Sequence, residues 1–336
     1  MSESILCLLP TNPDGSLDRV SLECLAAASA LKQKSGVSLT VGCWGKAPEA
    51  GIAACDADRY CIIEGESFAA PRYATDVAAA EALVKASEAS MVLAPASSRI
   101  QRFLPGLAAK SDGVVDTHCT GIDFAEGQFT ATRWFYRQRI ETVVSRKNVR
   151  PWMVSLESGC AEAIAIGDQP TFESIEAPTV ASRTQIKTIE ATSGGDQTIR
   201  PDSDMLLVAG AGWTKKQADG SVKTDKAAAL ILDFINRRKA SLGSSKSMVD
   251  LSSEGHAVLP FLTHLHQIGQ TGATPRHTKG LSTCCHGEEP HAVGWRFIKE
   301  RRAINLDANC GWAHGKADVL YIADAFEVME KVNALL

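Results

Sequence analysis

Three glycine turns lie in the second half of the chain, at Gly210–Gly212, Gly269–Gly272 and Cys285–Gly287. Glycine lets a backbone approach a phosphate closely, and a helix that begins after such a turn supplies free N–H donors. Each turn alone is a weak signal. Three of them in one stretch of alternating strands and helices predict a ligand site at the carboxyl ends of parallel strands.

The sequence gives less support to other kinds of site. The first turn lacks the later glycine of a dinucleotide fingerprint, which argues against a nicotinamide site. The cluster Cys284, Cys285, His286 and His291 contains zinc-ligand types, but adjacent cysteines rarely bind one ion well. The chain has neither a Gly-x-Ser-x-Gly elbow nor a P-loop. We therefore predict no metal site and no catalytic residue.

In the first half of the chain, predicted strands and helices alternate. Apolar runs at 5–9, 38–44, 59–63 and 90–94 predict strands, and helical patterns occur at 16–33 and 73–88. This order predicts a parallel sheet covered by helices. Between 113 and 156 the pattern changes to successive strands at 128–136, 140–144 and 151–155, which we expect to be antiparallel additions to the sheet edge.

A second strand–helix series begins at Asp204. It includes predicted strands at 205–209 and 319–322, short runs at 280–287 and 303–305, and helices at 225–238 and 326–336. The polar segment 171–203 is interpreted as a connector. A chain of 336 residues exceeds what one core usually organises. We expect an α/β fold with two domains: residues 1–180, with a parallel sheet and added antiparallel strands, and residues 203–336, with a doubly wound sheet.

Bulk composition argues against several classes of protein. The net charge of −4 argues against nucleic-acid binding, although basic residues gather at 133–150 and 299–302, where a solvated face or a docking patch would explain them. No apolar run approaches the ~20 residues of a membrane helix, and the amino terminus lacks the basic region of a secretory signal. The ten cysteines are dispersed, which favours reduced core thiols in a cytoplasmic protein.

The order of several motifs is more specific than any one of them. Successive segments of this chain resemble motifs of electron transfer flavoprotein alpha subunits: 243–250, 267–272, 286–291, 303–307 and 317–326. In the first half, 93–98 and 133–144 resemble the same family. The resemblance covers nearly the whole chain, and it is strong from 204 to 332 and diffuse before 171.

This resemblance implies that the C-terminal domain binds FAD and that the N-terminal domain contacts a beta subunit in a heterodimer. Electrons would come from a flavoprotein dehydrogenase and pass to a quinone reductase or another acceptor. The implied cofactor-binding positions are Gly210, Ala211, Gly212, Lys246, Gln267, Gln270, Thr271, Gly272, His286, Gly287, His291, Asn305, Asp307 and Asp324. Gln270 and Thr271 would contact the flavin ring or ribityl chain, and His291 the carbonyl end of the ring.

Several positions depart from the family pattern. Ala211 replaces an arginine that lies over the flavin in the family, Lys246 replaces a second arginine, His286 replaces a serine, and Cys284 and Cys285 stand where small residues are usual. The departures at Ala211, Cys284 and His286 leave open a redox-silent structural homologue within a larger dehydrogenase complex. A bifurcating electron transfer flavoprotein, with a second flavin on the beta subunit, also stays open. The resemblance implies a cytoplasmic protein, or a mitochondrial matrix protein in a eukaryote.

Overall fold

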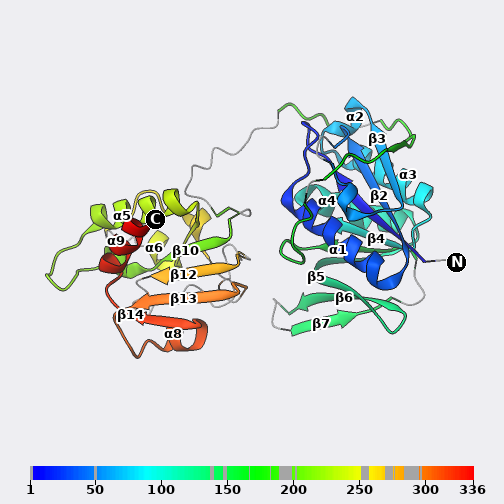
Figure 1. The fold of residues 1–336 in the computed structure, drawn as a ribbon. Coiled ribbons are helices and arrows are strands. Elements are labelled where there is room, and N and C mark those ends of the chain that lie inside the picture. The colour runs from blue at the N-terminus through cyan, green and yellow to red at the C-terminus, as the bar shows by residue number, and fades with distance from the viewer. Residues whose placement is uncertain are drawn as a thin grey trace. The chain divides into compact units, whose positions relative to one another are not determined.

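The chain folds into two compact units, Met1–Glu190 and Ala191–Leu336, each built from helices around one sheet (Figure 1). The computed structural model describes residues 3–48, 51–136, 140–146, 150–165, 167–181, 183–188, 199–200, 203–250, 257–268, 275, 277–283, 295 and 297–336. The predicted two-domain α/β fold is confirmed. No helix in these ranges is both long and apolar enough to cross a membrane.

The first unit is organised around a nine-stranded sheet with the order β7-β6-β5-β8-β4-β1-β2-β3-β9. Its strands are β1 (Ser4–Pro10), β2 (Ser38–Gly45), β3 (Arg59–Glu64), β4 (Met91–Pro95), β5 (Val114–Ala125), β6 (Gln128–Phe135), β7 (Ile140–Val144), β8 (Trp152–Leu156) and β9 (Glu173–Ser174). All neighbours are parallel except β5–β6 and β6–β7. The predicted antiparallel strands at 128–136 and 140–144 are therefore confirmed.

Helices cover both faces of this sheet. One face packs against α1 (Arg19–Ser35), which begins where the Asp18 carboxylate caps the backbone N–H of Ser21. The other face packs against α2 (Glu66–Ala69), α3 (Tyr73–Ser87) and α4 (Ser98–Lys110). Successive side chains of β1 point to opposite faces of the sheet, and helices cover both faces. Cys7 therefore packs on the side of α1, whereas Leu6 and Leu8 pack on the side of the other helices.

The prediction that 151–155 is an antiparallel edge strand was wrong. β8 lies inside the sheet and pairs in parallel with both β4 and β5. All five of its residues are buried, because neighbouring strands and helical layers exclude water from every side. A continuous buried strand of this kind is typical of parallel pairing. In the segment predicted as a connector, β9 pairs in parallel with β3, and Ile175 and Ala177 pack against the core.

The second unit has a five-stranded parallel sheet with the order β11-β10-β12-β13-β14, as a doubly wound fold requires. Its strands are β10 (Met205–Ala209), β11 (Ser241–Ser244), β12 (Lys279–Thr283), β13 (Glu300–Asn305) and β14 (Val319–Ile322). Its helices include α5 (Thr224–Arg238), α6 (Lys246–Asp250), α8 (Gly311–Lys316) and α9 (Ala325–Leu335). α5 and α9 pack on one face and α8 on the other. Sequence analysis missed β11, whose four residues show no apolar alternation.

A buried ion pair fills the carboxyl edge of the first sheet between β1 and β4. Arg99, in the first turn of α4, donates to the Asp76 carboxylate at 2.7 Å and to the carbonyl oxygens of Thr11 and Phe68. The indole of Trp44 donates to the same carboxylate at 2.9 Å. The strand order reverses here, which is where doubly wound sheets bind ligands. In this unit the side chains of Arg99, Asp76 and Trp44 occupy that place.

A buried carboxylate joins the antiparallel strands to the parallel ones. Asp116 on β5 accepts hydrogen bonds from Arg133 on β6 at 3.0 Å, from Arg146 at 2.9 Å and from the indole of Trp152 on β8 at 2.9 Å. Burial alone would raise the pKa of Asp116. The hydrogen bonds from Arg146, Trp152 and Arg133, together with the positive charge of Arg146, outweigh that effect and hold this pKa below its usual value.

We expect Arg99→Ala to lower the free energy of unfolding by about 3–5 kcal/mol, because it leaves the fully buried Asp76 carboxylate without its cation. Urea denaturation of the purified protein measures the change. The matched control is Lys85→Ala, which removes an exposed ion pair with Glu81 and should cost only about 0.3–0.5 kcal/mol. Equal losses in the two variants would contradict the role given to Arg99.

We expect Asp116→Asn to destabilise the protein at neutral pH and to do so less at acid pH. Because the pKa of folded Asp116 is depressed, the carboxylate contributes stability above the unfolded pKa of about 3.9. That contribution is lost as the pH falls through the lower folded pKa. Urea denaturation of both proteins between pH 7 and the lowest pH that keeps them folded tests this. A difference in unfolding free energy that stays constant below about pH 4 would refute it.

Candidate functional site

The carboxyl edge of the second sheet carries the first of the three turns that the sequence singled out, and the turns at 269–272 and 285–287 lie outside the described residues. The turn after β10 is a short 3₁₀ helix, Ala211–Thr214, and the backbone N–H of Gly210 donates to the Thr283 carbonyl at the end of β12. The N–H of Ser245, just after β11, donates to the Ala209 carbonyl at the end of β10. These bonds join the ends of three neighbouring strands at the reversal of strand order between β10 and β12.

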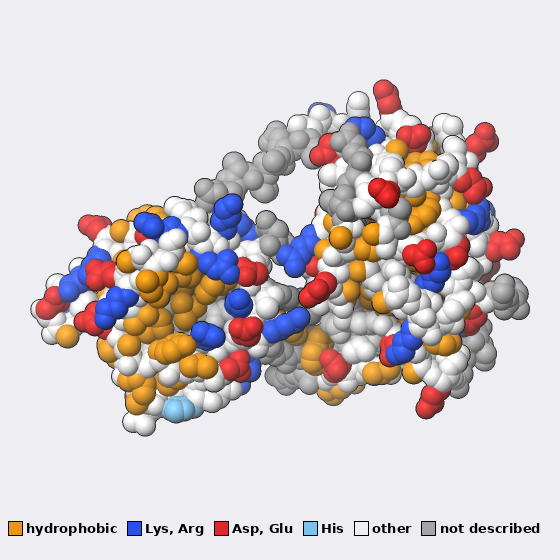
Figure 2. Space-filling view, viewed as in Figure 1, with side chains coloured by type: hydrophobic (Ala, Val, Ile, Leu, Met, Phe, Trp, Pro, Cys, Tyr) orange, Lys and Arg blue, Asp and Glu red, His pale blue; other side chains and the backbone are white. Residues whose placement is uncertain are grey.

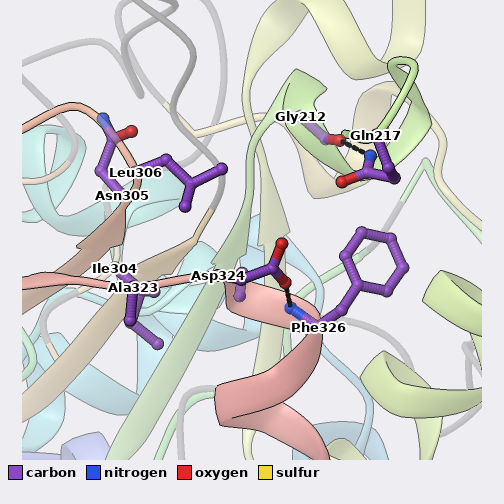
Figure 3. Close-up of a pocket in the computed structure, with 9 residues that line it drawn as sticks. Gly212, Gln217, Ile304, Asn305, Leu306, Ala323, Asp324 and Phe326 are labelled. Atoms are coloured by element: carbon purple, nitrogen blue, oxygen red, sulfur yellow. Dashed lines mark hydrogen bonds between the residues drawn. The ribbon is translucent and has the colours of Figure 1, made fainter. Parts of the chain in front are cut away.

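A small hollow of about 20 Å³ opens at this edge (Figure 3). Three predicted positions line it: Gly212 from the turn after β10, Asn305 from the end of β13 and Asp324 from the start of α9. These come from distant parts of the sequence, and parallel pairing places them together. The other lining residues are Gln217, Ile304, Leu306, Ala323, Ala325 and Phe326.

Two lining side chains are fixed by hydrogen bonds within the site. Asp324 is the N-cap of α9, and its carboxylate accepts from the backbone N–H of Phe326 at 2.7 Å and of Glu327 at 3.3 Å. Gln217 donates from its side-chain amide to the Gly212 carbonyl at 3.1 Å, as Figure 3 shows. Sequence analysis missed Gln217 because it lies in a polar loop without a motif.

Asn305 carries an unused hydrogen-bond donor. Only 5% of its surface is exposed, and its Oδ1 accepts from the backbone N–H of Asp307 at 3.1 Å. Its Nδ2 has no hydrogen-bond partner. Buried polar groups are nearly always paired, so an unpaired buried N–H next to a hollow indicates a place for a ligand acceptor. The side chain of Asp307 itself is exposed.

A second group of polar residues lies at the end of β11. Ser244 and Ser245 are fully buried, and neither hydroxyl has a hydrogen-bond partner. Gln267 forms an isolated parallel bridge with Ser244 and is 5% exposed, and Lys246 begins α6 with an exposed side chain. The structure therefore brings the predicted positions Lys246 and Gln267 together, apart from the lining of the hollow.

Ala211 belongs to the apolar core of this unit. It is fully buried beside Trp213, whose indole donates to the Thr283 hydroxyl at 2.8 Å and whose ring lies 4.6 Å from that of Phe326. The arginine expected from the family pattern is thus replaced by a methyl group in a closed apolar cluster. This position supplies no positive charge to the edge.

Six predicted positions lie outside the described residues: Gln270, Thr271, Gly272, His286, Gly287 and His291. Cys284 and Cys285 lie outside them as well. Within the described ranges, no group of three or more His, Cys, Asp or Glu residues could hold a metal ion.

Comparison with known proteins assigns the chain to a family. A model of the electron transfer flavoprotein domain matches residues 5–193, which is more than half of the chain. The chain belongs to the electron transfer flavoprotein family. The electron transfer flavoprotein subunit alpha of Methylophilus methylotrophus is 23% identical over 328 residues, which cover 94% of each chain. The family resemblance seen in the sequence is confirmed.

The described residues of this family member are compatible with a flavin nucleotide at the edge. Three buried polar groups lack protein partners there: Asn305 Nδ2 and the hydroxyls of Ser244 and Ser245. An amide N–H donates, and a hydroxyl both donates and accepts, so these groups suit the polar atoms of a sugar, a phosphate or a purine. Gly212 has no side chain to block the approach of a ligand at the hollow.

We expect Ser244→Ala to leave the ligand-free protein equally stable, or to stabilise it by up to about 1 kcal/mol, because it removes an unpaired buried hydroxyl. The matched control lies at the opposite end of the same strand. The Ser241 hydroxyl accepts from the Arg200 N–H at 2.7 Å and lies 2.7 Å from His277 Nε2, so Ser241→Ala should cost about 1–3 kcal/mol. Urea denaturation measures both, and equal losses would show that the Ser244 hydroxyl is needed by the fold.

Proposed function

We propose that this chain is the alpha subunit of an electron transfer flavoprotein. It pairs with a beta subunit, accepts electrons from a flavoprotein dehydrogenase and passes them, through FAD held at the carboxyl edge of the second sheet, to a quinone reductase or another acceptor. A cytoplasmic location, or the mitochondrial matrix in a eukaryote, belongs to the same proposal. The observation that carries it is the likeness to an alpha subunit along 94% of both chains.

The proposal gives the described residues distinct tasks. Bound FAD supplies the redox chemistry, and the chain converts no substrate itself. Asn305 Nδ2 would donate to the adenosine side, and the hydroxyls of Ser244 and Ser245 would bind oxygen atoms of the nucleotide. Asp324 fixes the start of α9 beside the hollow, and Gln217 holds the Gly212 carbonyl. Gln270, Thr271 and His291 keep the roles that the family resemblance implies.

One observation favours a second candidate. Ala211 is uncharged and fully buried, whereas the family pattern has an arginine over the flavin at this position. A chain that has lost this charge could serve as a redox-silent structural subunit of a larger dehydrogenase complex. The two candidates differ in one measurable property, since only the first requires a flavin.

The test is the visible absorption spectrum of the chain purified with its beta partner. We expect flavin bands and about one FAD per heterodimer after heat release, because buried polar groups without protein partners lie together at the carboxyl edge of the second sheet. Ser244→Ala in the same heterodimer should retain less flavin, whereas Ser241→Ala should retain the wild-type amount per folded protein. A colourless heterodimer that takes up no added FAD would support the structural subunit and refute the carrier.

A further inference from the structure

Two hydrogen-bond acceptors without donors lie at the hollow of the second unit. Asp324 accepts its two backbone hydrogen bonds through Oδ1, and the amide nitrogen of Gln217 donates to the carbonyl oxygens of Gly212 at 3.1 Å and Lys215 at 2.7 Å. Within the described residues, neither Asp324 Oδ2 nor Gln217 Oε1 accepts a hydrogen bond. Figure 3 shows both oxygen atoms directed toward the space between these two side chains.

The loop that carries Gln217 is held in shape by its own hydrogen bonds. The backbone N–H of Gln217 donates to the Ser221 carbonyl at 2.8 Å, and its carbonyl accepts from the Gly220 N–H at 2.9 Å. The Asp219 carboxylate accepts from the Ser221 hydroxyl at 2.7 Å and pairs with Lys223 at 2.6 Å. The donors and the backbone carbonyl of Gln217 are thus already used, and Oε1 is the group that this ordered loop offers to a ligand.

The size of the hollow limits what can enter it. Its volume of about 20 Å³ exceeds the roughly 10–15 Å³ that one water needs, but it cannot hold a purine ring. One small polar group of a ligand therefore enters, and it must donate to acceptors on two sides. An –NH₂ group does so with its two hydrogens, whereas a carbonyl oxygen would face two acceptors. Two oxygen atoms are too few for a bound cation, which takes about six or more.

The other residues at the hollow suit the flat face of a base. Leu306 lines it although 59% of its surface is exposed, and Ile304 and Phe326 add further apolar surface. Asn305, on the same lining, offers its unpaired Nδ2 as a donor. Adenine has two apolar faces, and its exocyclic amino group lies beside ring nitrogens that accept hydrogen bonds. It therefore matches the paired acceptors, the single donor and the apolar surface at once.

We infer that Gln217 and Asp324 read the base of the bound nucleotide. The exocyclic amino group of adenine enters the hollow and donates to Gln217 Oε1 and Asp324 Oδ2, and the face of the base packs on Leu306. The inference rests on the proposed FAD site and adds to it a specificity-determining residue, Gln217, which belongs to no motif of the family resemblance. Hypoxanthine, with an oxygen in place of the amino group, sets an acceptor against two acceptors and is rejected.

Binding of two flavin dinucleotides tests the inference. The flavin-free heterodimer is titrated with FAD and with the FAD analogue that carries hypoxanthine in place of adenine, and the change in flavin fluorescence gives both dissociation constants. We expect the analogue to bind about tenfold or more weakly, because its oxygen leaves both acceptors without a donor. Equal dissociation constants would overturn the inference and leave the FAD site standing. A heterodimer that binds neither compound would remove the proposed function and this inference together.

A substitution at Gln217 separates base reading from a purely structural role. Gln217→Lys keeps N–H donors for the carbonyl oxygens of Gly212 and Lys215 but presents a donor to the hollow instead of an acceptor. The ratio of the analogue's dissociation constant to that of FAD should fall by about tenfold or more. A general loss of stability weakens both compounds alike and leaves this ratio unchanged.

The matched control is Ala218→Lys, which adds the same charge to the next residue of the loop. Ala218 is exposed and does not line the hollow, so this variant should keep the wild-type ratio. A ratio that stays at the wild-type value in Gln217→Lys, or that falls equally in both variants, would overturn the role given to Gln217.

Discussion

Parallel pairing is the constraint on which the second unit depends. Because β10 to β14 all run in one direction, their carboxyl ends meet at one edge of the sheet. Gly212, Asn305 and Asp324 follow three different strands and would otherwise be far apart. The same edge carries three of the buried polar groups that lack partners, Asn305 Nδ2 and the hydroxyls of Ser244 and Ser245. The location of the site is thus a property of strand direction, and the side chains decide only what it can bind.

The first unit shows the same constraint with another outcome. Its parallel strands also end at one edge, and its strand order also reverses there, between β1 and β4. Arg99, Asp76 and Trp44 fill that place with a hydrogen-bonded network. A doubly wound sheet therefore provides a location for a ligand but does not guarantee a site. In this chain the ion pair of Arg99 and Asp76 occupies the first location, although Asp76 Oδ2 has no hydrogen-bond partner there, and at the second location the unpartnered groups are Asn305 Nδ2 and two serine hydroxyls.

The two units also differ in how completely helices cover the faces of their sheets. Both faces of the first sheet have their helical layers, and the buried Asp116 ties the antiparallel strands to it. The second sheet leaves β13 and β14 open on one face. Parallel sheets are normally covered on both faces, so this open apolar face (Figure 2) distinguishes the second unit from the first.

The sequence by itself determined the type of most elements and the family. Apolar periodicity predicted β10, β14 and α5 correctly, and the ordered motifs identified an electron transfer flavoprotein. Tertiary structure alone decided what depends on distant neighbours. The parallel place of β8 and the existence of β11 follow from pairing partners far away in the chain. The side-chain N–H of Asn305 has no partner because none of the described residues packed around it offers an acceptor, and the local sequence does not reveal which residues these are.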